Sequence, residues 1–168
     1  PQPSNMVRAK KHIAGCRRNQ LITTLCFASL QVYQIDGNNA NTIIEMIAQS
    51  LPHIVPNVLL AKREELLPLI LCAANLHPSA KSRDSLLNTL FNLIKRPDAL
   101  QRQMILTGCI MFAQYNGPQK VEEELLPQCW EQIGDKHMER RLLVVDACCA
   151  LIPYMSVSHH CNFIPDLI

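Results

Sequence analysis

Cysteine and histidine, the residues best suited to metal or nucleophilic chemistry, gather only near the C-terminal end of the chain. His159, His160 and Cys161 are adjacent, and Cys148 and Cys149 lie about ten residues before them. Zinc sites use spaced clips such as C-x-x-C or H-x-x-x-H, because the ligands must converge on one ion. A Cys/His hydrolase needs its thiolate beside a base in a cleft. The adjacent "HHC" satisfies neither requirement, so we predict no metal site and no nucleophile there.

Three consecutive acids, Glu122 to Glu124, are the second group that could do chemistry. A pair of carboxylates would suit glycosidase-like acid–base catalysis. Acids that follow Pro118 also fit the first turn of a helix, where the helix dipole stabilises negative charge without any further role. The chain has no G-x-G-x-x-G, G-x-x-x-x-G-K-[ST], G-x-S-x-G or H-E-x-x-H motif. We therefore predict that the protein is not an enzyme and has no catalytic, cofactor-binding or metal-binding residues.

Basic residues near expected helix starts and turns are the better candidates for function, as contacts for a protein partner. Arginine is favoured at the energetic centres of protein interfaces. The candidate partner-binding residues are Arg83, Lys95, Arg96, Arg102, Arg140 and Arg141.

The charge distribution suggests an alternative class, a helical module that binds nucleic acid or an anionic membrane. Residues 1–35 carry Arg8, Lys10, Lys11, Arg17 and Arg18 and no acid, although the whole chain has a net charge of only +2. Five basic residues without interleaved aromatic residues are more typical of a solvated helix face. We therefore keep protein binding as the main interpretation.

The composition indicates a folded, helical protein in a reducing compartment. Apolar residues make up 48% of the 168 residues, charged residues 18% and aromatic residues only 5%. This mix favours helices packed on helices over a sheet sandwich. The 8 cysteines lie mostly inside apolar runs and do not have the spacing of a disulfide framework. No apolar run approaches the ~18 residues that span a bilayer, and the chain starts at Pro1 without a signal-peptide pattern. We expect a fragment of a cytoplasmic protein.

Apolar residues recur with a helical period in four places, at 86–94, 104–112, 121–133 and 142–152. The stretch "LLPLILCAANL" (66–76) is apolar nearly all round, which predicts a helix covered on both sides. Two further helices are expected near 20–35 and from Thr42, the latter with Glu45 completing a capping box.

Turn signals separate these helices. Pro97 is expected to end one helix, with Asp98 and Gln101 forming a capping box for the next. Gly117 is expected to stop that helix before Pro118. Gly134 is expected to end a later helix, with Asp135 capping the one after it. The segment around Pro78 is expected to make a similar turn.

The interval between helices predicts an α-solenoid of antiparallel helix hairpins, as in HEAT and armadillo proteins. Arg83, Arg102 and Arg140 mark helix starts that are separated by a 19-residue and then a 38-residue interval, which implies a 38-residue hairpin. Overlaying 101–109 on 139–147 at this spacing aligns apolar residues. Helix pairs with a period of about 40 residues are typical of these solenoids.

The phrase "EELLP" occurs at 64–68 and again at 123–127, a 59-residue interval. This distance is close to three helices, so the two copies are not equivalent positions of a strict two-helix repeat. Each copy is expected to place a proline within a helix and to kink it. Pro56 and Pro118 are expected at the helix starts before them.

Longer phrases carry a family resemblance. The stretches "LPHIVPNVLLAKREELLPLIL", "LFNLIKRPDALQRQMILTGC" and "ELLPQCWEQI…ERRLLV" resemble the start of the HEAT-repeat region of the RELCH family, proteins that contain a LisH element and HEAT repeats. The resemblance runs from about Ser50 to Pro153. We expect a basic helical segment at 1–40, HEAT-like repeats at 41–153 and a divergent tail at 154–168.

The resemblance implies a non-enzymatic scaffold that sits peripherally on recycling endosomes and the trans-Golgi network. Such proteins tether the two compartments and promote cholesterol transport by engaging a Rab-type GTPase and an oxysterol-binding protein. The LisH element and the coiled coil of the family are not visible in this chain, so membrane bridging is not expected of this segment alone.

Overall fold

A computed structural model describes residues 37–156, and within this range every regular element is helical. The helix expected near 20–35, most of the basic N-terminal segment and the "HHC" cluster lie outside the described residues. The elements are α2 (Gly37–Asn57), the 3₁₀-helix η1 (Leu60–Leu66), α3 (Leu67–Leu76), α4 (Ala80–Asn92), α5 (Ala99–Lys120), the π-helix η2 (Val121–Leu125), α6 (Leu126–Trp130), α7 (Met138–Leu151) and the 3₁₀-helix η3 (Ile152–Tyr154).

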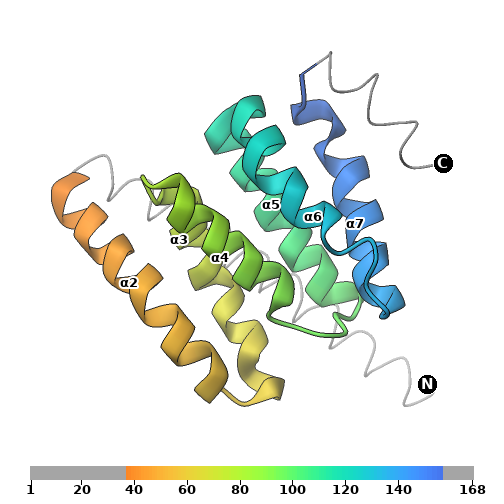
Figure 1. Cartoon of the computed structure of the whole chain (residues 1–168), viewed down its shortest axis with the longest axis horizontal. Helices are drawn as coiled ribbons and strands as arrows, with labels where there is room; N and C mark the ends of the chain where they lie inside the picture. The colour runs from red at the N-terminus through yellow and green to blue at the C-terminus, as the bar shows by residue number, and fades with distance from the viewer. Residues whose placement is uncertain (1–36, 157–168) are drawn as a thin grey trace, which may run out of the picture.

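The helices pack in two rows, and the elements follow one another across the molecule in chain order (Figure 1). In one row α3 contacts α5 and α5 contacts α7. In the other row α4 contacts both η2 and α6. Connections between rows are made by α2 with α3, by α3 with α4, and by α6 with α7. The prediction of helices packed on helices is confirmed for the described residues.

Buried positions recur along the chain with a 39-residue period. In one row Ile70, Cys109 and Cys148 are buried, and so are Ala73, Phe112 and Leu151. In the other row Leu51, Leu90 and Cys129 are buried. The members of each set are 39 positions apart (70, 109 and 148, for example). The predicted 38-residue overlay is therefore one residue short, because it follows the arginines at the helix starts and not the core.

Several predicted core residues face solvent instead. Val145, Ile133 and Ile152 are exposed, whereas Val144 and Leu151 are buried. For Val145, the cause is that apolar residues occur on several faces of α7, so the hydrophobic pattern alone does not show which face is buried. In contrast, the prediction for 66–76 is confirmed for most of α3 (Leu67–Leu76), whose side chains are largely buried, including Asn75, whereas Leu69 is exposed.

Some helix boundaries differ from the expected ones. Residues Gly37–Asn41 are already helical ahead of the expected start at Thr42, and Ala40 among them is buried. Such tertiary contacts outweigh the low helix propensity of glycine and asparagine. Pro56 lies inside α2 and not at a helix start. Helix α4 ends at Asn92, ahead of Pro97.

The capping box at the start of α5 is confirmed. The Asp98 carboxylate accepts hydrogen bonds from the backbone N–H groups of Leu100 and Gln101, both at 2.9 Å, and the Gln101 side chain accepts from the N–H of Asp98 at 3.0 Å. The cap predicted at Asp135 is wrong, because the N-cap of α7 is His137. The Asp135 carboxylate instead accepts the backbone N–H of His137 at 2.7 Å.

Gly117 breaks the helical path as predicted. Its φ of 80° and ψ of 173° are non-helical and divide α5 from the turns that begin at Pro118. Positive φ is accessible to glycine at little cost because it has no Cβ. The chain therefore reverses here and passes through η2 into α6.

The two copies of "EELLP" lie where irregular helix gives way to α-helix. Glu64 and Glu65 belong to η1 and Glu123 and Glu124 to η2, and each proline is the second residue of the α-helix that follows. Each proline lies inside a longer helical run, as expected, because the backbone is helical from η1 into α3 and from Pro118 through η2 into α6. The 3₁₀- and π-helical turns directly before the two prolines mark where the regular backbone hydrogen bonding of the run changes. Helix α3 shares a row with α5 and α7 whereas α6 packs against α4, so the copies are not equivalent positions.

Candidate interaction surfaces

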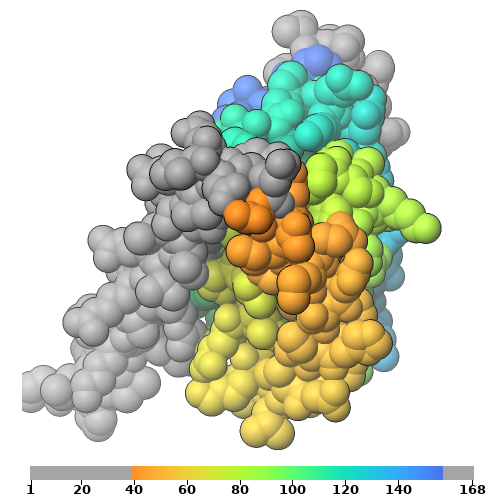
Figure 2. All heavy atoms as spheres, turned by 90° about the vertical axis from the view of Figure 1, so that its left-hand side faces the viewer, coloured from red at the N-terminus to blue at the C-terminus, as the bar shows by residue number. Residues whose placement is uncertain are grey.

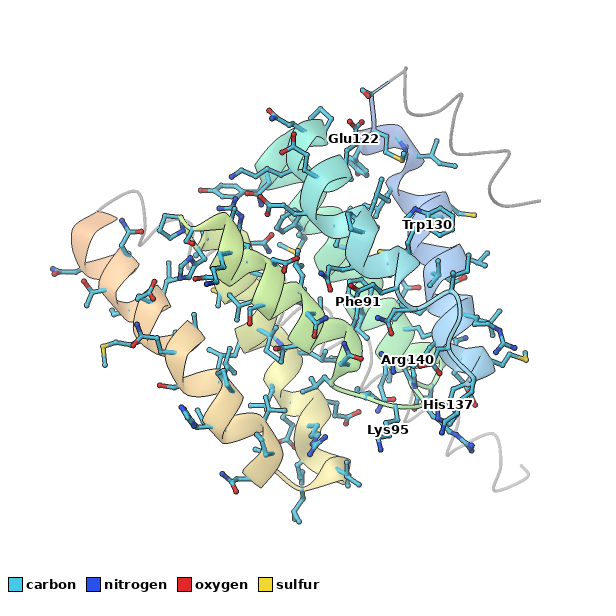
Figure 3. All side chains as sticks on the ribbon, in the orientation of Figure 1. Phe91, Lys95, Glu122, Trp130, His137 and Arg140 are labelled. Atoms are coloured by element: carbon cyan, nitrogen blue, oxygen red, sulfur yellow. The ribbon has the colours of Figure 1, made fainter. Side chains whose placement is uncertain are left out.

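The structure brings five of the six predicted partner-binding residues to one end of the helices. Lys95 and Arg96 lie in the loop between α4 and α5, Arg102 lies in the first turn of α5, and Arg140 and Arg141 lie in the first turn of α7. Figure 3 shows Lys95, His137 and Arg140 near one another at this end, with Glu122 at the other. Arg83 lies at that opposite end, in the first turn of α4.

Arg83 is buried and fully engaged. Its Nε and Nη2 donate to the two carboxylate oxygens of Glu124 at 2.7 and 2.5 Å. Its Nη1 donates to the backbone carbonyls of His77 and Pro78 at 2.8 and 2.9 Å. The hydrogen bond to Glu124 raises the pKa of the Arg83 guanidinium above its ordinary value. This arginine holds the α3–α4 turn against η2.

Arg140 has a similar structural role at the other end. Its Nη2 donates to the carbonyl of Phe91 at 3.0 Å and also contacts the side-chain oxygens of Asn92 and Gln132. Its Nη1 lies 3.0 Å from the Asp135 carboxylate. The backbone N–H of His137 lowers the pKa of the Asp135 carboxyl, and the charge of Arg140 lowers it further. Arg140 therefore joins the end of α4 to the α6–α7 loop.

Arg102 is also largely buried. Its Nη1 donates to the carbonyl of Pro97 at 3.1 Å, and its Nε lies 3.5 Å from the Asp146 carboxylate of α7. The side chain thus connects the start of α5 to the middle of α7 and exposes little charge.

Four exposed cations form what we call the basic end patch: Lys95, Arg96, Lys136 and Arg141. The loops that carry them are in contact, because Arg96 Nε donates to His137 Nδ1 at 3.1 Å. Arg141 donates to the carbonyl of Asp135 at 2.7 Å and forms no ion pair with another described residue. Lys95 and Lys136 likewise form no ion pair within residues 37–156, although the charge of Lys136 helps to lower the pKa of the Asp135 carboxyl.

Two exposed apolar side chains belong to the loop and helix start that carry Lys136 and Arg141. Ile133 is 43% exposed and Met138 is 61% exposed. Sequence reasoning missed Lys136 and Met138, and it placed Ile133 in the core. The sequence feature that could have identified Lys136 and Met138 as exposed is their position between Gly134 and the pair Arg140 and Arg141, where the chain reverses direction.

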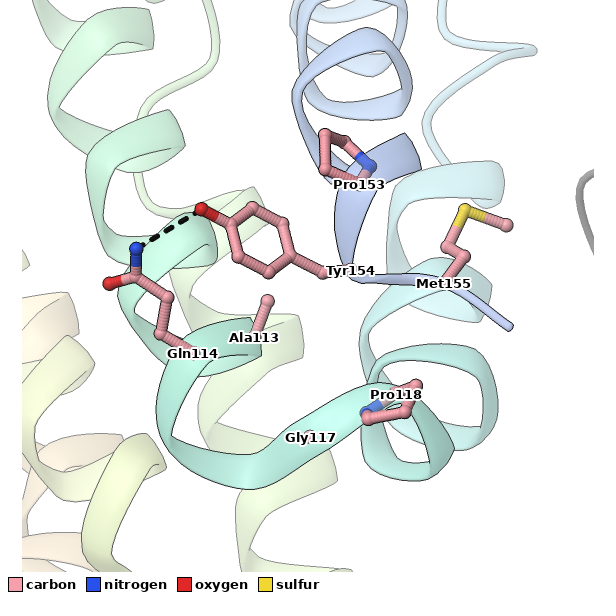
Figure 4. A pocket seen from close by; sticks show the side chains of 7 residues that line it. All are labelled: Ala113, Gln114, Gly117, Pro118, Pro153, Tyr154 and Met155. Atoms are coloured by element: carbon pink, nitrogen blue, oxygen red, sulfur yellow. Dashed lines mark hydrogen bonds between the residues drawn. The ribbon is translucent and has the colours of Figure 1, made fainter. Parts of the chain in front are cut away.

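A hollow of about 410 Å³ lies at the opposite end, between the end of α5 and η3. Figure 4 shows Gly117 and Pro118 on one side and Pro153, Tyr154 and Met155 on the other. The Tyr154 hydroxyl accepts a hydrogen bond from the Gln114 side chain at 3.1 Å. Among the described residues that line this hollow, none has a carboxylate or a basic side chain that could act as a general acid or base.

The acids of η2 are engaged in separate contacts. Glu124 pairs with Arg83, Glu123 accepts from Gln119 at 3.0 Å, and Glu122 accepts from the N–H of Ser156 at 2.6 Å. These contacts match structural roles. Within residues 37–156 no group of three or more His, Cys, Asp or Glu side chains converges as a metal site would require.

The buried cysteine thiols are also poor nucleophiles. Burial raises the pKa of Cys109 to about 12 and that of Cys148 to about 11, and it raises the pKa of Cys129 well above its ordinary value. The nucleophilic form of cysteine is the thiolate. These three residues therefore remain protonated at neutral pH. No helix within the described range has the length and apolar character needed to cross a membrane.

The described part of the chain is thus an all-helical domain with a basic end patch on two adjacent loops and the start of α7. A family model described as the RAB11-binding protein RELCH N-terminal domain matches residues 36–166. The chain belongs to this family, which confirms the RELCH resemblance. The match extends beyond the expected limits of Ser50 and Pro153 at both ends.

Curated relatives carry the same name. The chain is 67% identical over 119 residues to a RAB11-binding protein RELCH homolog from Danio rerio, covering 71% of the chain. It is 65% identical over 119 residues, again 71% of the chain, to RAB11-binding protein RELCH from Homo sapiens. The chain spans about a tenth of the length of these relatives. No solved structure matches it.

Proposed function

We propose that this chain is a protein-interaction segment that binds a Rab-type GTPase. The observation that carries the proposal is membership of a family whose relatives from zebrafish to human are named for binding RAB11. The segment itself is proposed to act as a scaffold, with no catalytic step.

We further propose that its helices form part of a HEAT-like α-solenoid. The 39-residue recurrence of buried positions supports this architecture, since HEAT and armadillo repeats have periods of roughly 40–47 residues. Contacts between neighbouring helices of each row support it as well. Stacked helix pairs present a long surface along which a partner can bind.

The proposed contact surface is the basic end patch together with Ile133 and Met138. Of the six residues predicted from sequence, Lys95, Arg96 and Arg141 have exposed charges that a partner can reach, and Lys136 joins them. Charge on the rim of an interface speeds association, and apolar anchors supply most of the affinity. Arg83, Arg102 and Arg140 are proposed to act indirectly, by holding the helices that carry the patch.

For the whole protein we propose the role implied by the resemblance, a tether between recycling endosomes and the trans-Golgi network that promotes cholesterol transport. An oxysterol-binding protein would be the second partner. Because this chain is about a tenth of its relatives' length, the second partner and the membrane contacts are assigned to the whole protein. Membrane association of this segment would then be indirect.

Binding of purified RAB11, loaded with a GTP analogue, to the immobilised chain tests the proposal. We expect the quadruple variant Lys95→Glu/Arg96→Glu/Lys136→Glu/Arg141→Glu to lose at least about tenfold in affinity, a change of about 1.4 kcal/mol. Lys81→Glu is the matched control, because Lys81 is an exposed lysine at the opposite end. If the quadruple variant bound RAB11 as tightly as the unaltered chain, the proposed contact surface would be wrong. If the unaltered chain did not bind RAB11, the proposed function would be wrong.

The alternative of an anionic membrane or nucleic acid is favoured by the same cluster of cations. Vesicles containing phosphatidylserine and a random-sequence duplex distinguish it. Binding to either that falls steeply between low and physiological salt, without RAB11 binding, would favour this electrostatic interpretation.

A further inference from the structure

Two adjacent leucines protrude from the turn between α2 and η1. Leu59 is 76% exposed and Leu60 is 73% exposed, more than any other large apolar side chain among the described residues. Figure 2 shows this turn, in gold and yellow, at the lower edge of the described part of the molecule. A single exposed leucine is ordinary on a protein surface, but two neighbouring leucines that both lie in solvent mark a candidate contact with another molecule.

The turn is held in a defined conformation by its own hydrogen bonds. The backbone N–H of Lys62 donates to the carbonyl of Leu59 at 2.8 Å, and the Lys62 ammonium pairs with the Glu65 carboxylate at 2.8 Å. Arg63 Nε donates to the carbonyl of Val58 at 3.4 Å. Apolar side chains on an ordered turn can bind a partner without the entropic cost of ordering that turn.

This turn adjoins the loops that carry the basic end patch, because it lies at the same end of the helices (Figure 1). The Gln101 side chain, in the first turn of α5, donates to the Glu64 carboxylate of η1 at 2.7 Å. The loop directly before α5 carries Arg96, which donates to His137 at 3.1 Å. Hydrogen bonds therefore join the α2–η1, α4–α5 and α6–α7 connections into one continuous edge.

The 39-residue repeat places Leu60 at the position of Met138. Leu60, Ala99 and Met138 are the first residues of η1, α5 and α7, and all three are exposed. Each is followed three residues later by an arginine. Met138 already belongs to the proposed contact surface. The first and third units of the repeat thus present a large apolar side chain at the same place, with the small Ala99 between them.

A single protein partner can reach both apolar positions. Packed helices lie about 8–10 Å apart, so the starts of η1 and α7, two steps apart in one row, are separated by roughly 20 Å. A protein interface of standard size uses about 20–30 residues on each side. The two loops of the basic end patch contain fewer residues than that. An interface of ordinary size that includes the patch therefore has room for the neighbouring α2–η1 turn.

We propose that Leu59 and Leu60 are a second apolar contact for the GTPase that the basic end patch binds. This inference rests on the proposed function and adds to it a site without charge. The partner spans three successive helix connections, with the leucines on one flank, Ile133 and Met138 on the other, and the cations between them. Buried apolar anchors slow dissociation, whereas exposed cations mainly speed association.

Binding of RAB11, loaded with a GTP analogue, to the immobilised Leu59→Ser/Leu60→Ser variant tests this contact. We expect the affinity to fall at least about tenfold through faster dissociation, with the association rate at low salt nearly unchanged. Because both leucines are largely exposed, thermal unfolding of the variant is expected to match that of the unaltered chain. The matched control is Ile43→Ser/Met46→Ser, at two apolar residues early in α2 that are more than half exposed, and it is expected to keep the full affinity.

A photo-crosslinking residue in place of Leu60 provides an independent measurement, and we expect it to crosslink to RAB11. If the unaltered chain bound RAB11 and the Leu59→Ser/Leu60→Ser variant bound it equally tightly, this inference would be overturned while the proposed function stood. Crosslinks to phosphatidylserine vesicles, with none to RAB11, would overturn it in favour of a lipid contact. An unaltered chain that does not bind RAB11 would overturn the proposed function and this inference together.

Discussion

Arg83 and Glu124 form a two-pronged ion pair that joins α4 to η2, segments that are distant in the chain. Two nitrogens of the guanidinium meet the two oxygens of the carboxylate at 2.7 and 2.5 Å, and both side chains are largely buried. The remaining nitrogen of Arg83 satisfies two carbonyls at the end of α3. One charge pair thus fixes the α3–α4 turn and the irregular segment η2 relative to each other.

Removing the acid from this pair is expected to destabilise the fold. Glu124→Gln leaves the Arg83 charge buried and unpaired, which costs about 3 kcal/mol in comparable buried pairs. Urea denaturation followed by circular dichroism measures the change. Glu123→Gln, at the exposed neighbouring acid, is the control and is expected to alter stability by less than about 0.5 kcal/mol. Equal effects of the two variants would refute a structural role for the pair.

A close approach between α3 and α5 gives a second prediction, at Gly108. A Cβ there would lie 2.2 to 2.8 Å from three carbon atoms of the Leu71 side chain, which is itself buried. Gly108→Ala is therefore expected to lower the free energy of unfolding by about 1–3 kcal/mol through overpacking. Gly134→Ala serves as the control because a Cβ at Gly134 would meet nothing within 4 Å. A neutral or stabilising Gly108→Ala would show that α3 and α5 are not packed this closely.

Much of the helical order could be predicted from local sequence, because the signals are chemical and short-range. Asp98 and Gln101 satisfy each other's backbone groups, and Gly117 adopts a positive φ that other residues avoid. The helical conformation of residues 37–41 could not be predicted this way. Ala40 in this stretch is buried, and burial depends on tertiary packing that the local sequence does not encode.

The repeat period predicted from the sequence differs by one residue from the period of the core. The arginines at the helix starts indicate a 38-residue period, whereas the core has a 39-residue period. Arg102 and Arg140 are both in first turns, yet they bind different partners, Asp146 and Asp135. Their side chains are long enough to tolerate a shift of one residue, and close-packed core residues such as Cys109 and Cys148 are not.

The candidate interaction surface was only partly predictable for a related reason. Sequence placed six basic residues near turns, but arginine serves equally well as a buried hydrogen-bond donor to carbonyls and carboxylates. Distinguishing Arg140 from Arg141 requires knowing which of two adjacent side chains faces the Phe91 carbonyl. That information comes only from the packing of α7 against its neighbours.

The buried cysteines predict a loss of stability at alkaline pH. The pKa of Cys109 is raised to about 12 and that of Cys148 to about 11, from an ordinary value of 9.0. The unfolded chain therefore loses these protons first as pH rises, and the folded state binds more protons. Stability is fully present below about pH 9 and falls between about pH 9 and the raised pKa values.

Urea midpoints at pH 8 and pH 10 measure this loss. Lysine and tyrosine also titrate in this range, so the comparison between variants is the readout. Cys148→Ala is expected to reduce the dependence on pH, because it removes one raised pKa. Cys149→Ser, at the exposed neighbour, is expected to leave it unchanged. Identical pH dependence in both variants would contradict the burial of Cys148.

Arg140 and Arg141 are adjacent in α7, and we predict a structural role for Arg140 and a surface role for Arg141. Arg140→Met removes a buried guanidinium that contacts Asp135, Gln132 and the Phe91 carbonyl, and it leaves those groups without their donor. We expect a loss of about 3 kcal/mol in the free energy of unfolding. Arg141→Met removes an exposed charge and one bond to a carbonyl, so its cost is expected to be below about 0.5 kcal/mol. If the basic end patch binds RAB11, Arg141→Met should nevertheless weaken that binding, chiefly by slowing association at low salt. A variant of Arg141 that unfolds the domain, or one of Arg140 that leaves its stability intact, would reverse these assignments.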